Sequence, residues 1–192
     1  MKIGVLALQG DFAEHIRMLR HIGVEVAEVR LPHELEDLSG LIIPGGESTT
    51  IGKLAVHYRL MEPLREFGRR KPIWGTCAGA IFISKDVHRS QPLLNLMDIT
   101  VERNAFGRQV NSFEIDLEVP ALRQVDPAGA PFHAVFIRAP LIESVQADVR
   151  ELASLSDGRI VAAQQGLLLA TSFHPELTED DRFHRYFLRL VE

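Results

Sequence analysis

The chain has 192 residues, 46% of them hydrophobic and 24% charged, and its formal net charge at pH 7 is -5. This length predicts a single domain over residues 1–192 with one sizeable core, and the acidic balance argues against nucleic-acid binding, which needs a basic face. The lone cysteine excludes an internal disulfide and fits a cytoplasmic protein, and no apolar stretch approaches the roughly 20 residues of a membrane span.

The first half of the chain alternates short apolar runs with segments of helical spacing. Strands are predicted at residues 3–8, 24–29, 41–43 and 73–74. One helix is predicted where Phe12, Ile16 and Leu19 recur at helical spacing, and another over residues 51–67 with a break near Pro63. Strands that alternate with helices predict a parallel sheet with helices on both faces.

The second half of the chain has a different pattern, with more strands and fewer helices. Strands are predicted at residues 99–102, 112–117, 132–136 and 167–172, together with a hairpin of 151–155 and 160–164. The hairpin is expected to turn at Asp157-Gly158, and a final helix carries Phe183, Phe187 and Leu190 on one face. The segments near Ser90 and at 126–131 are predicted to be surface loops. Together the two halves predict a mixed α/β fold.

The only cysteine of the chain lies in the segment Gly75-Thr76-Cys77-Ala78-Gly79, between two apolar runs. This order predicts a strand, a tight turn and a helix, with the Cys77 thiol at the bend. The small flanking residues permit a sharp turn, and the helix N-terminus favours the thiolate, which is the nucleophilic form. The pattern therefore predicts a nucleophile elbow with cysteine in place of serine.

His174 is the predicted general base. Pro175 restricts His174 to extended geometry, so we expect residues 174–176 to run as a short extended stretch. Side chains two apart in an extended chain point the same way, which places the Glu176 carboxylate beside the His174 ring. One ring nitrogen can then face Cys77 while Glu176 holds the other, as in a catalytic triad.

Gly45 and Gly46 follow the predicted strand at 41–43 and suit a site that stabilises negative charge. Their backbone N–H groups, with no side chains in the way, can combine with that of Ala78 to form an oxyanion hole. Gly-Gly after a strand is a weak signal by itself, and a lone cysteine is most often a small buried hydrophobe. The shared position of these segments at strand ends is what favours a site, because open α/β sheets bind ligands there.

Several other polar residues are predicted to have no catalytic role. Acidic residues 179–181 and His184 stand at the start of the last helix, where acids are favoured electrostatically, so no metal site is predicted there. His15 and His21 fall on or near the first helix and are predicted to be ordinary surface histidines.

Three of these segments resemble the signatures of class I, triad-type glutamine amidotransferases. They are the cysteine segment 75–79, the histidine segment 173–176 and the glycine segment 44–48. Further segments make the chain resemble the family of glutaminase subunits of pyridoxal 5'-phosphate synthase: residues 4–10, 44–50, 101–104, 106–109, 136–140 and 172–180. The resemblance runs from the first strand to the last helix. It implies a single-domain, flavodoxin-like sheet that is mostly parallel, with some antiparallel strands in the C-terminal half.

The resemblance also implies a reaction and a partner. Cys77 would attack the side-chain amide of L-glutamine, His174 would shuttle protons and Glu176 would orient the histidine. The ammonia would pass to a barrel-shaped synthase subunit, in a large hetero-oligomer, that makes pyridoxal 5'-phosphate from a pentose phosphate and a triose phosphate. No cofactor, metal or membrane partner is implied for this chain. Because the Gly45–Gly46 peptide can flip cheaply, we expect the isolated chain to be poorly active.

The segments that contact L-glutamine in the resembling family match three places in this sequence. The corresponding residues are Gly46, Glu47, Ser48, Arg103, Ile137 and Arg138. The ammonium of free glutamine suits Glu47, and its carboxylate suits an arginine fork, with the choice between Arg103 and Arg138 open. Gln9 and Gly10 are expected to line the same cleft because they follow the first strand.

Two further hypotheses stay open from the sequence alone. The cysteine elbow also suits an α/β hydrolase that acts on another amide or ester. A noncatalytic docking subunit is the other alternative, although such a subunit would be expected to have lost part of the triad, and here all three residues are present.

Overall fold

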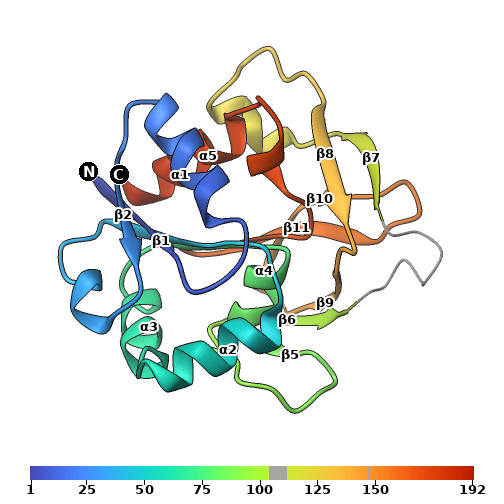
Figure 1. Ribbon diagram of the computed structural model, residues 1–192. Coiled ribbons are helices and arrows are strands. Elements are labelled where there is room, and N and C mark those ends of the chain that lie inside the picture. Colours follow the sequence, from blue (N-terminus) through green and yellow to red (C-terminus); the bar gives the residue numbers. More distant parts are fainter. Residues whose placement is uncertain (104–111, 147) are drawn as a thin grey trace.

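A computed structural model describes residues 1–103, 112–146 and 148–192, and its framework is a large mixed β-sheet with helices on both faces (Figure 1). Its strands are β1 (Lys2–Leu6), β2 (Glu25–Val29), β3 (Gly40–Ile43), β4 (Ile73–Thr76), β5 (Ser84–Asp86), β6 (Met97–Glu102), β9 (Leu141–Val145), β10 (Arg150–Ser154), β11 (Ile160–Gln165) and β12 (Leu168–Thr171). Their order is β2-β1-β3-β4-β12-β11-β9-β6-β5, and β10 pairs with β11. Two further strands, β7 (Ser112–Leu117) and β8 (Phe132–Ile137), form a separate antiparallel pair.

The helices cover the sheet in two layers, each with its own apolar core. One face carries α1 (Phe12–His21) and α5 (Arg182–Val191), and the other carries α2 (Ser48–His57), α3 (Met61–Gly68) and α4 (Ala78–Ile83) (Figure 1). The α1 and α5 side includes Leu19, Phe183 and Phe187, all fully buried. Three short 3-10 turns complete the described helical structure, at Pro32–Leu35, Pro120–Gln124 and Pro175–Leu177.

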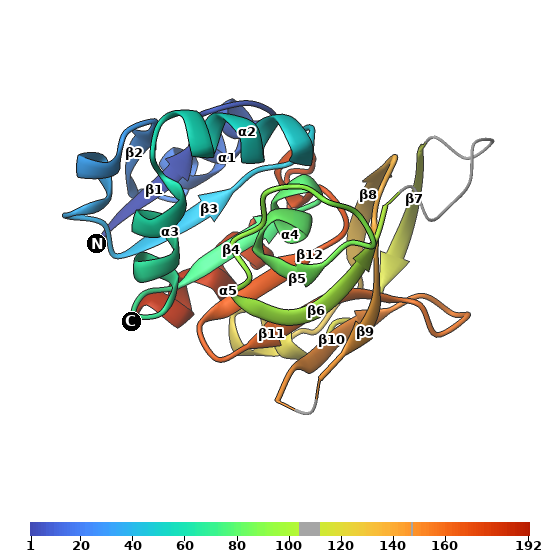
Figure 2. The same ribbon diagram turned by 90° about the horizontal axis from the view of Figure 1, so that it is seen from below.

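The parallel part of the sheet brings the predicted site residues to one edge. β1 pairs in parallel with β2 and β3, β4 pairs in parallel with β3 and β12, and the carboxyl ends of these strands therefore lie together. The chain leaves β1 towards Gln9, β3 towards Gly45, β4 towards Cys77 and β12 towards His174. The predicted mixed fold is confirmed, with β9, β10 and β11 supplying antiparallel pairings in the C-terminal half (Figure 2).

The helix predicted over 51–67 with a break near Pro63 is observed as two helices, α2 and α3, and the break lies at residues 58–60, just before Pro63. Arg59 adopts a positive φ of 57°, which ends α2, and Leu60 precedes the first turn of α3. Pro63 is the third residue of α3, where its missing N–H would have no intrahelical partner, so it is accommodated without a kink.

The strands predicted in the second half lie close to the observed ones. β7 coincides with the predicted range, and the hairpin of β10 and β11 turns at Asp157-Gly158, where Gly158 has a positive φ of 84°. The predicted loops at 126–131 and near Ser90 contain no helix or strand. β5 and β9 are not predicted. Asn104, the last residue of the resembling segment 101–104, and the whole resembling segment 106–109 lie outside the described residues. Among the residues described, no helix combines the length and the apolar character needed to cross a membrane.

Candidate active site

Cys77 stands at a strained turn between β4 and α4. Its backbone has φ 48° and ψ -104°, a region that non-glycine residues rarely adopt and that is typical of functional sites. Its N–H donates to the Thr171 carbonyl at 2.8 Å, which fixes the turn against β12. The predicted nucleophile elbow is therefore present in the backbone.

The glycines on either side of Cys77 serve close packing rather than an unusual φ. A Cβ on Gly75 would lie 2.5 Å from backbone atoms of Gly79, and a Cβ on Gly79 would lie 2.0 Å from the Ile43 carbonyl oxygen. Both distances are far below van der Waals contact, so larger residues would push α4 away from the sheet. The two glycines thus allow strand and helix to meet closely at the thiol.

His174 and Glu176 form a buried pair beside Cys77. The His174 Nδ1 atom lies 2.7 Å from Glu176 Oε1, and the Cys77 thiol is close enough to the His174 ring to raise the pKa of that ring. Both side chains are almost fully buried, with 5% of His174 and 0% of Glu176 exposed. The backbone N–H of His174 donates to the Val135 carbonyl at 2.9 Å. The structure therefore brings together all three predicted catalytic residues in the order that triad chemistry needs.

The route by which Glu176 reaches His174 differs from the prediction. The extended stretch over 174–176 is wrong, because Pro175 begins a 3-10 turn that contains Glu176. Proline restricts the residue before it, and His174 is indeed non-helical with φ -110° and ψ 84°, but proline itself suits the first position of a helical turn. The turn, rather than an extended run, directs the carboxylate to the ring.

The charges of the pair follow from burial and hydrogen bonding. Burial alone would lower the pKa of His174, but the hydrogen bonds with Cys77 and Glu176 outweigh it and raise that pKa to about 10. Burial raises the pKa of Glu176, and its hydrogen bond to His174 opposes that effect. The raised pKa of His174 favours the imidazolium form of this ring.

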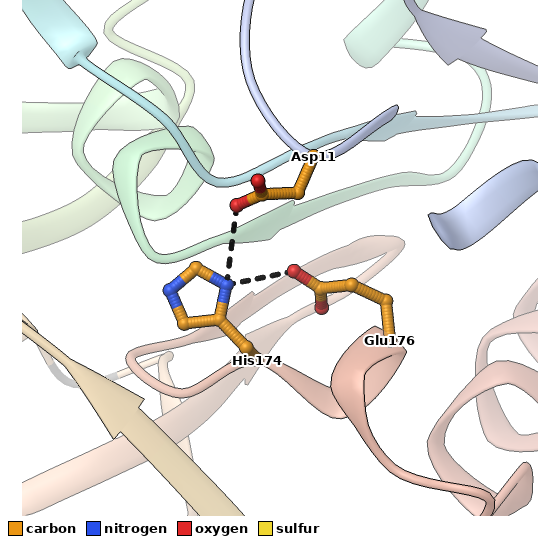
Figure 3. A group of neighbouring side chains, drawn as sticks. All are labelled: Asp11, His174 and Glu176. Atoms are coloured by element: carbon orange, nitrogen blue, oxygen red, sulfur yellow. Dashed lines mark hydrogen bonds and ion pairs between the residues drawn. The ribbon is translucent and has the colours of Figure 1, made fainter. Parts of the chain in front are cut away.

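Asp11 supplies a second carboxylate near His174 that sequence reasoning missed. Its Oδ2 atom lies 3.6 Å from His174 Nδ1, which is also the atom that Glu176 holds (Figure 3). These three residues are the group of possible metal ligands found in the described part of the chain. Metal binding would compete with the 2.7 Å bond between His174 and Glu176, so this structure favours the hydrogen-bonded arrangement. The available signal was the position of Asp11 directly after Gln9-Gly10.

The predicted oxyanion-hole residues lie near Cys77 and His174, and two of them, Gly46 and Ala78, line the cleft that is described below. The Gly45 carbonyl accepts a hydrogen bond from the Asp11 N–H at 3.1 Å, so the N–H of Gly46 points in the opposite direction. Within the described residues, neither the Gly46 nor the Ala78 N–H has a hydrogen-bond partner. Gly45 itself is buried against the His174 ring, since a Cβ there would lie 2.5 Å from His174 Cε1.

A cleft of about 380 Å³ opens in front of the thiol. It is lined by Gln9, Gly10, Asp11, Gly46, Glu47, Ser48, Cys77, Ala78, Ile81, Arg103, Ile137, Arg138, Pro140, His174 and Leu177. All six residues expected to contact glutamine are among them, and so are Gln9 and Gly10. Glu176 and Gly45 are both buried and do not line the cleft.

Glu47 and Arg103 form an ion pair on one side of the cleft. Arg103 Nη2 lies 3.0 Å from Glu47 Oε1, and Arg103 Nη1 donates to Thr49 Oγ1 at 3.2 Å. Glu47 also caps α2 by accepting from the Thr50 N–H at 2.7 Å. Burial would raise the pKa of Glu47, but its hydrogen bonds with Thr50 and Thr49 outweigh this and lower it to about 2. The carboxylate is therefore ionised and held in place before any ligand binds.

Ile137 and Arg138 also line the cleft, and the backbone of Arg138 is unusual. Arg138 has a positive φ of 43°, while its side chain is exposed. A strained non-glycine backbone beside a cleft is typical of active sites and ligand-binding sites. Within the described residues the Arg138 guanidinium makes no hydrogen bond or ion pair, in contrast to that of Arg103.

The prediction for His15 is wrong. His15 is fully buried and lies beside the triad, whereas His21 is exposed as predicted. His184 is also fully buried, and its ring contacts His15 instead of lying among the acidic residues that precede it. The missed signal is helical spacing, because His15 shares a face of α1 with Phe12, Ile16 and Leu19.

The sequence matches one protein family over almost its whole length. Residues 5–192 match the SNO glutamine amidotransferase family. The chain is 59% identical to a pyridoxal 5'-phosphate synthase subunit PdxT from Herpetosiphon aurantiacus, over 99% of this chain and 100% of the relative. It is 54% identical to the subunit of the same name from Moorella thermoacetica, over the full length of both.

Solved structures show the same fold. A crystal structure of a glutamine amidotransferase superposes with a TM-score of 0.91 at 51% identity and covers 98% of both chains. The structure of PurLQS from Thermotoga maritima superposes with a TM-score of 0.72 at 16% identity, which is a likeness of fold alone.

Proposed function

Because the chain belongs to the SNO glutamine amidotransferase family, we propose that Cys77, His174 and Glu176 are the triad with which it hydrolyses L-glutamine. The chain is a glutaminase that supplies ammonia for the synthesis of pyridoxal 5'-phosphate. The observation that carries the triad assignment is the strained elbow at Cys77, which meets a His174 ring already bound to Glu176. Replacement of Cys77 by alanine tests it, since glutamine hydrolysis should be lost.

The proposed reaction begins at the Cys77 thiolate. Its sulfur attacks the amide carbon of the glutamine side chain, and the carbonyl oxygen becomes an oxyanion that the N–H groups of Gly46 and Ala78 can receive. The protonated His174 gives its proton to the leaving nitrogen, the C–N bond breaks, and ammonia departs from a γ-glutamyl thioester. His174 then takes a proton from water, whose oxygen attacks the thioester carbon. The C–S bond breaks, and glutamate and the Cys77 thiolate are released.

Glutamine is proposed to bind with its amino-acid end against Glu47 and Arg103. This ion pair offers a carboxylate to the ammonium and guanidinium N–H groups to the carboxylate, and both side chains are already held by Thr49 and Thr50. A preorganised pair loses little entropy when the ligand binds. Arg138 is proposed to act through its backbone, because it lines the cleft with a strained, positive φ while its side chain is exposed.

Substitution of the two arginines separates these roles. Arg103→Gln is expected to raise the KM for glutamine by about 10-fold or more, since a charge-assisted hydrogen bond is lost. Arg138→Gln is expected to change KM by less than about 3-fold, because exposed charges contribute little. Steady-state kinetics of both variants checks this, with kcat nearly unchanged. A larger KM effect for Arg138→Gln than for Arg103→Gln would contradict the assignment.

The partner is proposed to be a barrel-shaped synthase subunit, in a large hetero-oligomer that combines the ammonia with a pentose phosphate and a triose phosphate. The chain works as one subunit of a synthase, as the names of its relatives indicate. Support for control by the partner comes from the glycine loop, where one peptide at Gly45–Gly46 sets the direction of an oxyanion-hole N–H.

Activity is therefore expected to depend on the partner. The isolated chain should hydrolyse glutamine at least about 10-fold more slowly than the complex. The complete absence of one oxyanion-hole donor lowers turnover by about 100- to 1000-fold. Ammonia release measured with and without the synthase subunit checks this. Equal turnover in the two samples would show that the hole is complete in the isolated chain.

A further inference from the structure

A buried polar cluster lies directly behind the proposed triad and has no part in the reaction described above. It joins His15 on α1 to His184 on α5, with His15 Nδ1 at 3.0 Å from His184 Nε2. His15 Nε2 lies 3.2 Å from Thr76 Oγ1 and 3.3 Å from Glu176 Oε2. His15, Thr76 and His184 have no exposed surface, and the rings of both histidines pack edge-on against Trp74.

The Glu176 carboxylate shows why this cluster matters. Its Oε1 atom binds His174, but its buried Oε2 atom has no hydrogen-bond partner in the described residues apart from the close approach of His15 Nε2. A buried carboxylate oxygen without a partner is costly, and a carboxylate held through Oε1 alone is oriented less firmly than one held through both oxygens. The nearby imidazole nitrogen is the group placed to prevent both.

The protons of the two histidines follow from their partners. If His15 carried its proton on Nδ1, a lone pair on Nε2 would face the Glu176 oxygen, and His184 would bury an N–H on Nδ1 with no acceptor. The other tautomer puts N–H groups on His184 Nε2 and His15 Nε2, and both then point along the chain of contacts towards Glu176. It leaves only a lone pair on His184 Nδ1 without a partner, which is the lower cost.

Both rings are uncharged at neutral pH. Burial lowers the pKa of His184 to about 3, and burial together with its histidine neighbours lowers the pKa of His15 well below its usual value. Neutral imidazoles have one donor and one acceptor each, so the contacts of one ring fix the tautomer of the other.

We propose that His15 is a positioning residue for glutamine hydrolysis, which holds the Glu176 carboxylate through its Nε2–H and is kept in the required tautomer by His184. The proposal rests on the proposed triad, because His15 does not line the cleft and acts only through Glu176. Its Nε2 atom is hydrogen-bonded to the hydroxyl of Thr76, the residue that precedes Cys77, and lies 3.3 Å from Glu176 Oε2. It thereby links the orientation of the carboxylate to the elbow.

The consequence is a specific kinetic effect. His15 acts on the orientation of Glu176 and hence on the ring that transfers protons, so its loss should lower kcat. It does not line the cleft, so the KM for glutamine should not change. A purely structural role in the core would instead lower thermal stability without a selective loss of kcat.

The experiment uses the glutaminase together with its synthase partner and compares His15→Leu with His15→Gln. Leucine fills the space without an N–H, and we expect kcat to fall about 10- to 100-fold with KM within about 2-fold, as is typical when a group that orients a reacting residue is lost. The glutamine side chain can present an amide N–H near the position of Nε2, so His15→Gln should recover kcat to within about 5-fold of the unchanged protein.

Phe187→Leu is the matched control for core damage, because Phe187 is fully buried in the same core and packs on Trp74 but not on Glu176. It should lower Tm as much as His15→Leu does and leave kcat unchanged. Cys77→Ala, assayed in parallel, tests the triad itself. Activity in that variant would overturn the proposed function, whereas loss of activity would support the triad, and the His15 variants then test the role of His15.

Two results would overturn the proposal for His15. One is an unchanged kcat in a folded His15→Leu variant, and the other is a His15→Gln variant as slow as His15→Leu. If His15→Leu does not fold, His184→Gln and His184→Leu provide the second comparison, because only the amide can donate to His15 Nδ1. We then expect the leucine variant to have a kcat several-fold below that of the glutamine variant, and equal values would contradict the proposal.

Discussion

Cys77→Ala is expected to lower kcat for glutamine hydrolysis by at least about 1000-fold, since the loss of a catalytic nucleophile leaves only binding and the oxyanion hole. The fold should be retained, because alanine meets the positive φ of 48° at no greater cost than cysteine and fills less space. Ammonia release in the presence of the synthase partner measures the effect. Calorimetric titration with glutamine should give a Kd close to that of the unchanged protein, because the Glu47–Arg103 pair is untouched.

Cys77→Ser is the matched control for this prediction. It restores a hydroxyl at the elbow without the readily ionised thiol, and should remain strongly impaired. A Cys77→Ala variant that still turns over glutamine at a comparable rate would show that the nucleophile lies elsewhere, and no other cysteine exists in the chain.

His174→Ala is expected to have the second-largest effect, a fall in kcat of about 1000-fold, because nucleophile and base act as a unit. The same variant should lose the imidazolium that stabilises the thiolate, since the pKa of His174 is raised to about 10 after its bonds with Cys77 and Glu176 outweigh burial. Alkylation of Cys77 by iodoacetamide at pH 7 should therefore become slower. Stopped-time labelling followed by mass spectrometry measures this rate.

His21→Ala is the control for that variant. His21 lies exposed at the end of α1, so both the glutamine turnover and the alkylation rate should stay unchanged. If alkylation in His174→Ala were as fast as in the unchanged protein, His174 would not be the group that activates the thiol.

The sequence reveals the elbow and the base because each has a strong local signal. Gly75 and Gly79 leave room for a close strand-to-helix approach, and their spacing around Cys77 is visible without any knowledge of distant contacts. The same holds for the Gly45–Gly46 turn after β3. Alternating strands and helices then predict that these segments meet at one edge of a parallel sheet, which the structure confirms.

Proline was the source of one local error. An extended stretch is predicted at Pro175, yet Pro175 lies in the first turn of a helical segment, as Pro63 does in α3. In that position the absent N–H costs no hydrogen bond, and the fixed φ suits the helix. A proline therefore restricts the residue before it more firmly than it determines the residues after it.

Burial of polar residues was the main feature that sequence reasoning missed. His15 and His184 are far apart in the chain and meet only because α1 and α5 pack on the same face of the sheet (Figure 1). Each does lie at helical spacing from core residues, Phe12 and Leu19 for one and Phe187 for the other. β5 is short and polar, so it offered no alternation from which to predict a strand.

The most direct measurement of the central claim is covalent capture of the thiol by a glutamine analogue that carries a diazoketone in place of the amide. In the complex with the synthase, mass spectrometry should find one adduct, on Cys77, formed with loss of dinitrogen and prevented by an excess of L-glutamine. An adduct on another residue, or labelling of Cys77 that glutamine does not slow, would contradict the assignment of this cleft and this sulfur to glutamine hydrolysis.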